Sequence, residues 1–246
     1  MLDKILIINS YNKGDDVRRI LSKGIPWDEE VEILNGDNSI RKITILGNEL
    51  NEILSNPDFS IEDLDYFNWI EDGDNIISVD KRYELMIFEI LLPKVNLNDV
   101  KEKLQKISFV EIDDKEWDKN RIDVGIIGYE EIKNRIPFNV GMEELVKMDK
   151  GCYPGQEIHA RLESRGKQKK ALVTLQSEEY ISQGEFKIKG GGKIIITTAS
   201  NGGEKGSTYF GIIPIKYIKD SKIILINGIE LKINKIINFR LLNVHH

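Results

Sequence analysis

Cys152 is the one cysteine of the chain, and it lies within the stretch MDKGCYPGQEIHAR, residues 148–161. Lys150 and Gly151 precede it, and Gly155 follows it. Glycines let backbone N–H groups approach a ligand closely, and a neighbouring cation favours a thiolate, so the pattern is typical of a reactive thiol. A free cysteine also packs commonly as a small buried hydrophobic residue. The spacing alone leaves both interpretations open.

The metal chemistry open to this chain is limited by its few thiols and imidazoles. One cysteine cannot form an internal disulfide, and with His159 as the one internal histidine it cannot build a structural zinc site or an all-protein iron–sulfur site. We therefore expect no metal site, and any cluster would need outside ligands. His159 alternates with Ile158 and Ala160 as on a strand, and we interpret it as a surface or hydrogen-bonded histidine rather than as the base of a Cys–His pair.

Basic residues crowd the stretch that follows. Five of them lie within ten positions: Arg161, Arg165, Lys167, Lys169 and Lys170. Such a run is commonly a solvated face, but arginine side chains also bind carboxylates and phosphates through two-point contacts. A polyanionic ligand would fit such a patch.

The composition is that of a globular chain with cores of its own. Among 246 residues, 40% are hydrophobic and 31% are charged, and no uninterrupted apolar run approaches the roughly 20 residues that span a bilayer. We expect a cytoplasmic protein that does not enter a membrane. The formal net charge of −6 argues against sequence-independent binding of nucleic acid over the whole surface.

The first two-thirds of the chain mix helix and strand patterns. Three segments indicate helices: 17–25, the segment after the capping-box-like residues 60–63, and 97–107. Five segments are typical of strands: 31–34, 40–46, 76–79, 83–91 and 107–112. The first two of these flank the turn Asn35-Gly36 and predict a hairpin. This order favours an α+β region.

After Gly166 the pattern changes to short β-branched and aromatic runs separated by glycine-rich turns. The runs are 171–175, 186–188, 193–198, 209–218, 223–226 and 231–237. Several short strands at this spacing predict a small barrel or sandwich. We therefore expect an N-terminal α+β region over 1–166 and a C-terminal β domain, a small barrel or sandwich, over 167–246.

Three stretches carry a family resemblance. KGCYPGQE at 150–157, followed by HARLESRGKQKKALVTL at 159–175, closely resembles the signature of the YgfZ family of tetrahydrofolate-binding proteins, relatives of the glycine-cleavage T-protein. NRIDVGI at 120–126 and IPFNVGMEELVKMDKGC at 136–152 resemble the segments that precede this signature. The match is good over 121–175, whereas residues before 120 match in plan only.

The resemblance implies a fold and a ligand. It implies two interlocked α+β portions and, over 167–246, a C-terminal antiparallel β-barrel, packed around a central cleft that accepts tetrahydrofolate or another folate. The residues that it places at the folate are Asn139, Lys150, Tyr153, Gln156, Glu157, Arg161 and Arg165. Asn139 stands where relatives usually carry Glu, and an amide offers one acceptor oxygen without the charge of a carboxylate.

The resemblance also implies a function. Members of the family are implicated in the assembly or repair of iron–sulfur proteins and in tRNA thiolation that depends on such enzymes, and Cys152 matches the cysteine tied to that role. We therefore expect an accessory factor, monomeric, with folate and iron–sulfur client proteins as partners and no stable nucleic acid. Two alternatives stay open: a folate-dependent aminomethyltransferase-like one-carbon transferase, and an RNA-binding or scaffold protein that uses the basic patch at 161–170.

Overall fold

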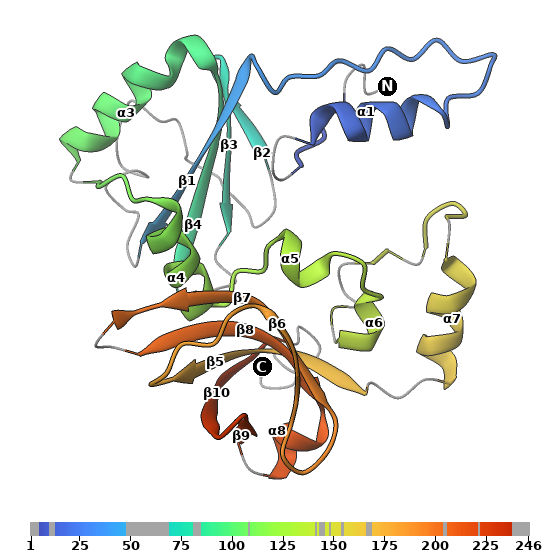
Figure 1. Ribbon diagram of the computed structural model, residues 1–246. Helices are drawn as coiled ribbons and strands as arrows, with labels where there is room; N and C mark the ends of the chain where they lie inside the picture. The colour runs from blue at the N-terminus through green and yellow to red at the C-terminus, as the bar shows by residue number, and fades with distance from the viewer. Residues whose placement is uncertain are drawn as a thin grey trace. The chain divides into compact units, whose positions relative to one another are not determined.

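The computed structural model describes most of the chain (Figure 1). The described residues are 5–9, 13–47, 69–80, 85–107, 109–140, 142, 146–147, 149–153, 155–165, 169–203, 206–220 and 222–237. The chain divides into two compact units, Met1–Glu111 and Ile112–His246. Each has a sheet and a hydrophobic core of its own, so the α+β class predicted from the sequence is confirmed.

The first unit contains a four-stranded antiparallel sheet in the order β1-β4-β3-β2. The strands are β1 (Ile40–Gly47), β2 (Trp69–Asp72), β3 (Asn75–Asp80) and β4 (Met86–Pro93). Ile77, Phe88 and Ile90 are fully buried between this sheet and α3 (Leu97–Lys106), which contributes Val100 and Leu104. Because Leu97, Val100 and Leu104 recur at helical spacing, one face of α3 covers the sheet, and the helix predicted here is confirmed. The 3-10 helix η1 (Lys94–Asn96) leads into it.

Helix α1 (Gly14–Ser22) precedes this sheet. The helix predicted over 17–25 is confirmed, although it ends at Ser22 and buries none of its residues within the described part of the chain. Ile20 and Leu21 are exposed on it. The predicted helix after residues 60–63 lies outside the described residues.

Two strands predicted in the first unit are wrong. Residues 31–36 are irregular, and the Asn35 side chain accepts a hydrogen bond from the Asp37 amide (2.9 Å), so Asn35-Gly36 forms a local turn that leads into β1 and joins no hairpin. Residues 109–113 form no strand either. There the Phe109 amide donates to the Leu104 carbonyl (3.2 Å) and closes the end of α3.

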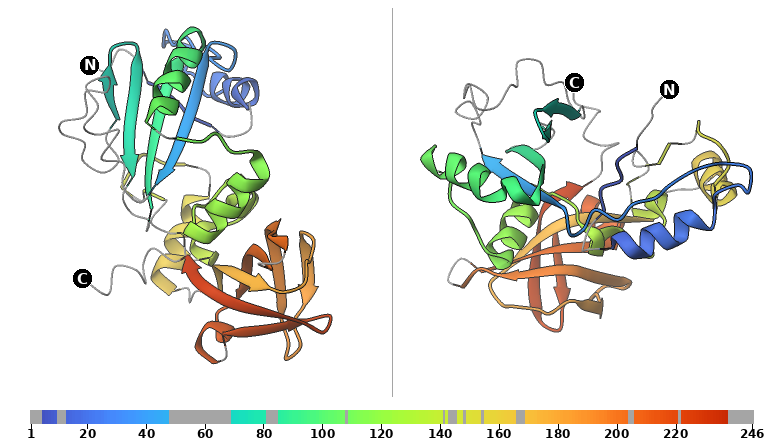
Figure 2. Two further views of the ribbon diagram at one scale, coloured as in Figure 1. Left: turned by 90° about the vertical axis from the view of Figure 1, so that its left-hand side faces the viewer. Right: turned by 90° about the horizontal axis from the view of Figure 1, so that it is seen from above.

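The second unit contains a six-stranded antiparallel sheet in the order β6-β7-β8-β5-β10-β9, which curls into a half-barrel (Figures 1 and 2). Its strands are β5 (Lys170–Ser177), β6 (Gly184–Lys187), β7 (Lys193–Asn201), β8 (Ser207–Pro214), β9 (Ile223–Ile226) and β10 (Ile229–Ile237). The strand runs predicted after Gly166 are thus found, except that 216–218 belong to the short helix α8 (Lys216–Asp220). The Lys189 amide donates to the Leu225 carbonyl (2.9 Å) and links the segment after β6 to β9.

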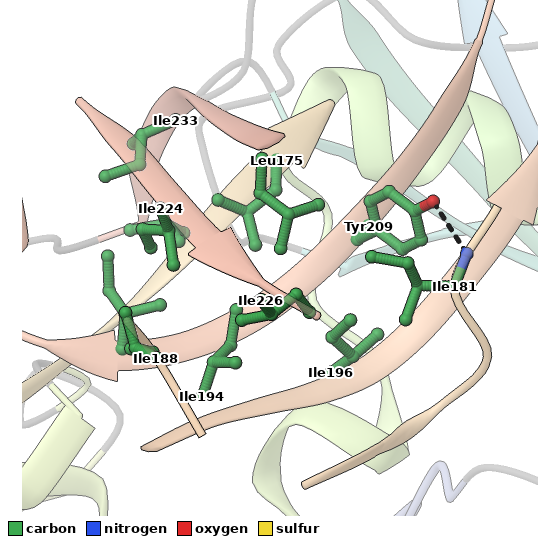
Figure 3. Packing of buried hydrophobic residues seen from close by; sticks show 12 residues of the cluster. Leu175, Ile181, Ile188, Ile194, Ile196, Tyr209, Ile224, Ile226 and Ile233 are labelled. Atoms are coloured by element: carbon green, nitrogen blue, oxygen red, sulfur yellow. Dashed lines mark hydrogen bonds between the residues drawn. The ribbon is translucent and has the colours of Figure 1, made fainter. Parts of the chain in front are cut away.

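Both faces of this curved sheet are buried. Val173, Leu175, Ile196 and Tyr209 belong to the inner cluster, in which the Tyr209 hydroxyl accepts a hydrogen bond from the Ile181 amide at 3.1 Å (Figure 3). The other face is covered by helices that bring Ile122, Val140 and Met142 against Leu172, Phe210 and Ile212. Alternate residues of β5 and β8 therefore serve two different clusters, which explains why these strands are apolar on both sides.

Four helices in the second unit were not predicted: α4 (Asp114–Val124), α5 (Tyr129–Ile132), α6 (Pro137–Val140) and α7 (Gln156–Arg165). Helix α4 is capped at its N-terminus by Asp113, whose side chain accepts a hydrogen bond from the Glu116 amide (2.8 Å), and at its C-terminus by Gly125 with φ +96°. Because α4 to α6 pack on β5, β7 and β8, residues that precede Gly166 are part of the second unit. The three-part plan, the boundary near 166, the interlocking and the closed barrel stay predictions.

Candidate functional site

Cys152 lies in the turn that leads into α7, and its side chain is exposed. The interpretation of Cys152 as a buried packing residue is therefore wrong, because the residue is exposed. Gly155 has φ +88°, and its carbonyl accepts hydrogen bonds from the amides of Ile158 (3.1 Å) and His159 (3.2 Å), so α7 begins directly after the turn. The thiol thus lies four residues before the first residue of α7.

Tyr153 and His159 meet across the first turn of α7. The Tyr153 hydroxyl and the His159 Nδ1 atom are hydrogen-bonded at 3.1 Å, and the two ring centroids are 5.7 Å apart. The predicted extended conformation around His159 is wrong, because residues 156–165 are helical. In a helix, residues three apart share a face. Gln156 and His159 therefore lie on one half-buried face of α7, whereas Glu157, Ile158 and Arg161 are exposed.

The ring pair is extended at both ends by other side chains. The Lys150 Nζ atom lies 4.6 Å from the centroid of the Tyr153 ring, a cation–π contact. The Phe138 ring of α6 packs on His159 with a centroid distance of 5.2 Å. We call these four residues, Lys150, Tyr153, His159 and Phe138, the ring ladder. Phe138 and His159 were not among the predicted binding residues, since only the turn before α7 and the α6–α7 packing bring them together.

The other predicted site residues are described in part. Gln156 is half-buried, while Glu157 and Arg161 have exposed side chains. Asn139 and Arg165 have helical backbones in α6 and α7, but their side chains lie outside what the structure describes, as does Lys167. Lys169 and Lys170 are exposed at the start of β5. Of the predicted site residues, the structure thus brings the Lys150 and Tyr153 side chains into contact, and the basic patch and the central folate cleft stay predictions.

A buried ion pair holds the helices of the second unit to its sheet. Arg121 of α4 is 5% exposed and Glu131 of α5 is fully buried, and their Nη1 and Oε2 atoms are 2.9 Å apart. The other Glu131 oxygen, Oε1, accepts hydrogen bonds from the Thr197 (2.8 Å) and Thr198 (2.6 Å) hydroxyls of β7. The Gly128 amide donates to Oε2 (2.8 Å). These hydrogen bonds connect α4, α5 and β7, and we assign them a structural role. Arg121 nevertheless lies in residues 120–126, one of the stretches that carry the family resemblance.

The surroundings of this pair favour both charges. Burial by itself would raise the pKa of Glu131, but Arg121, the Thr198 and Thr197 hydroxyls and the Gly128 amide outweigh it and lower the pKa below 4.5. Burial opposes the charge on Arg121 as well, yet Glu131 and Asp118 raise its pKa. The Arg121 guanidinium also lies 5.4 Å from the centre of the Phe210 ring. Arg121 and Glu131 are therefore both charged at neutral pH, and each lies beside a group of opposite charge.

Two features that could indicate another function are absent from the described part of the chain. Within it, no group of three or more His, Cys, Asp or Glu side chains is placed to hold a metal ion. No helix there is long and apolar enough to cross a membrane. A surface hollow lies along α1, lined by charged residues such as Asp16, Arg19 and Lys23. It belongs to the first unit and contains none of the predicted site residues, so it does not mark the site argued from the sequence.

Comparison with known proteins identifies a fold. The chain is similar to the crystal structure of glycine cleavage system aminomethyltransferase T from Bartonella henselae, with a TM-score of 0.58 and 20% sequence identity, over 71% of this chain and 52% of that one. The chain has a T-protein-like fold. It spans about half the length of that enzyme. No family model matches the chain, and no curated protein matches it, so the narrower YgfZ assignment stays a prediction.

Proposed function

We propose that the chain is a folate-binding accessory factor for iron–sulfur protein assembly or repair, acting through Cys152. The observation that carries the proposal is the exposed Cys152 thiol beside the ring ladder. The T-protein-like fold supports it, as does the resemblance of residues 150–157 to the YgfZ signature. Iron–sulfur client proteins are the proposed partners.

The side chains next to Cys152 fit the chemistry of a folate. A folate combines a flat heterocycle with an anionic tail, and such ligands pack on aromatic faces and pair with cations. Phe138, Tyr153 and His159 supply rings within one cluster, while Lys150 and the exposed Arg161 supply positive charge. In this proposal Gln156 and Glu157 add polar contacts, and Asn139 supplies an amide where relatives have a carboxylate.

The proposed task of Cys152 is to act as one transient thiolate ligand for iron or sulfur in transit. Biological iron–sulfur clusters are held by four protein ligands, and this chain has one cysteine. The remaining ligands would come from the client protein or from a small thiol. An exposed thiol is required for this, since both partners must reach the same iron atom.

The proposal is tested by folate titration and by replacement of the thiol. A ligand that binds only the folded state at 100 times its Kd adds about 2.7 kcal/mol of stability. We therefore expect tetrahydrofolate to raise the Tm by several degrees, whereas pterin-free p-aminobenzoylglutamate raises it less. In cells lacking the protein, the Cys152→Ser variant should fold and fail to restore the activity of iron–sulfur enzymes. Absence of a shift with every folate form, or full restoration by the serine variant, contradicts the proposal.

A folate-dependent one-carbon transferase is the second candidate, favoured by the similarity to an aminomethyltransferase. That enzyme class would turn over an aminomethyl donor with tetrahydrofolate in the absence of any iron–sulfur client. Replacement of Cys152 by serine should leave such turnover intact, because the thiol has no part in it. An aminomethyl-transfer assay on the wild type and on Cys152→Ser therefore separates the two candidates.

A further inference from the structure

The two neighbours that enclose Gly151 and Cys152 in the chain contact each other. The Lys150 Nζ atom lies 4.6 Å from the centre of the Tyr153 ring, so their side chains close a short arch around the intervening dipeptide. Adding a Cβ atom to Gly151 would meet no atom of the described residues within 4 Å, and Cys152 itself is exposed. Packing on Gly151 and Cys152 therefore does little to hold the arch. Its described restraints come from the side chains at its two ends.

The Tyr153 end of the arch is tied to the core of the second unit. Tyr153 is hydrogen-bonded to His159 of α7 at 3.1 Å, and His159 packs on Phe138 of α6 at 5.2 Å. Helix α6 ends with Val140 (3% exposed) and is followed by Met142 (1% exposed), and both lie in the cluster against Leu172 and Phe210. A continuous series of contacts thus leads from the buried face of the sheet to the residue beside the thiol.

Tyr153 and His159 are joined by a hydrogen bond, which is a directional contact. Two aliphatic side chains would fill the same space, whereas a hydrogen bond between a hydroxyl and a ring nitrogen also sets the direction of both rings. The pair is half-buried, where a hydrogen bond adds little to overall stability. Its main effect is therefore on the orientation of the turn at 150–153.

We propose that Tyr153 and His159 are positioning residues for Cys152: they hold the arch so that the exposed thiol points in one direction from the α6–α7 surface. This inference rests on the proposed function of Cys152. A ligand that must be completed by a client protein has to meet it in a defined geometry, and a thiol on a loosely held turn would meet it in that geometry only part of the time. His159 in this proposal acts through Tyr153 and makes no contact with iron or sulfur.

The experiment uses the fact that the chain has one cysteine, which a trifluoromethyl thiol label modifies without ambiguity. The ¹⁹F spectrum of the labelled wild type should show one dominant resonance. Tyr153→Phe removes the hydroxyl and keeps the ring, and His159→Leu removes the ring nitrogen; both should broaden or split the resonance. His159→Asn keeps a polar atom near the Nδ1 position and should restore it. Tyr180→Phe, at a tyrosine 51% exposed in a loop of the same unit, is the matched control.

The unlabelled variants are compared by complementation in cells lacking the protein. We expect Tyr153→Phe and His159→Leu to restore iron–sulfur enzyme activity about tenfold less well than the wild type, with the Tm within a few degrees of it. His159→Asn and Tyr180→Phe should restore it fully. Should His159→Leu fail to fold, Tyr153→Phe still decides.

The results distinguish a failure of the positioning role from a failure of the proposed function. The positioning role alone would be overturned if Tyr153→Phe and His159→Leu both gave wild-type spectra and wild-type complementation while Cys152→Ser failed to complement. A His159→Asn variant as impaired as His159→Leu would overturn the part assigned to the hydrogen bond. Full complementation by Cys152→Ser would overturn the proposed function, and the positioning role with it.

Discussion

At the scale of single residues, Arg121 and Glu131 show how this fold accommodates charge in its interior. Each is nearly or fully buried, and each finds several partners: Arg121 contacts Glu131, Asp118 and Thr198, and Glu131 accepts from Gly128 and two threonines. A buried pair of this kind adds little net stability over an apolar pair, but the removal of one member leaves the other charge unmatched. We therefore expect the pair to make the docking of α4 and α5 on β7 specific.

We predict that Glu131→Gln destabilises the protein by about 3 kcal/mol, because Arg121 then stays buried with Asp118 as its remaining carboxylate partner. Urea unfolding at pH 7 measures this free energy. Glu185→Gln is the matched control, since Glu185 forms an exposed ion pair with Lys193 in the same unit and should change stability little. Equal effects of the two substitutions would contradict a special role for the buried pair.

The same pair predicts a pH dependence. The pKa of Glu131 is lower in the folded protein than its ordinary value of 4.5. Its stabilising contribution is therefore fully present above pH 4.5 and is lost as the pH falls through the lowered folded-state pKa. The difference in unfolding free energy between the wild type and Glu131→Gln should thus narrow on acidification below pH 4.5. A difference that stays constant from pH 7 to pH 3 would show that Glu131 is not the group responsible.

At the scale of elements, the ends of the helices decide where the candidate site residues lie. Helix α4 ends at Gly125, whose φ of +96° allows the chain to turn back toward α5. A Cβ atom at this glycine would lie 2.7 Å from the Cδ1 atom of Ile237 in β10. Gly125 is therefore required both by backbone conformation and by the close approach of the helix end to the sheet.

We predict that Gly125→Ala costs more than the roughly 1–3 kcal/mol of a left-handed alanine, because the new methyl group also meets Ile237. Gly203→Ala is the matched control, since Gly203 has φ +62° and open space around it. The unfolding free energies of both variants, measured by heat and by urea, separate the cost of backbone strain from the cost of the contact with Ile237. The double variant Gly125→Ala, Ile237→Val lacks the Cδ1 atom and should recover part of the loss. No recovery would contradict the contact.

At the scale of the whole molecule, each of the two compact units has the means to fold around its own core. The second unit contains two hydrophobic clusters and the entire Arg121–Glu131 network, and the helices α4 to α7 are all part of it. The ring ladder and Cys152 are part of this unit as well. The proposed thiol chemistry and its positioning residues can therefore be studied at the level of one unit.

We predict that a fragment of residues 112–246 folds alone with a cooperative thermal transition, because its buried clusters are formed from its own strands and helices. Circular dichroism and amide exchange measure this directly. The ¹⁹F resonance of a label on Cys152 in the fragment should match that in the full chain, since the ring ladder is complete in it. A fragment without a cooperative transition would contradict the prediction.

The sequence by itself determined most of the strands and left much of the site undecided. Period-2 and apolar runs locate β1, β3, β4 and the six strands of the second unit, because such patterns depend on neighbours close in the chain. The same patterns predicted strands at 31–34 and 107–112 that do not form, because local turns and the end of a helix there contain the residue types that are typical of strands. The helices α5 and α6 were missed because four residues carry too little periodicity, and α4 and α7 because they are largely polar.

For the candidate site, sequence spacing singled out Cys152, Lys150 and Tyr153 but left open whether the thiol is buried or exposed. Exposure depends on packing between elements far apart in the chain, so only the tertiary structure decided it. The same holds for His159, which was read as extended, and for Phe138, which was not singled out. Their contacts form because α7 begins directly after Gly155 and because α6 packs on β5 and on α7. The local sequence does not encode this packing between elements.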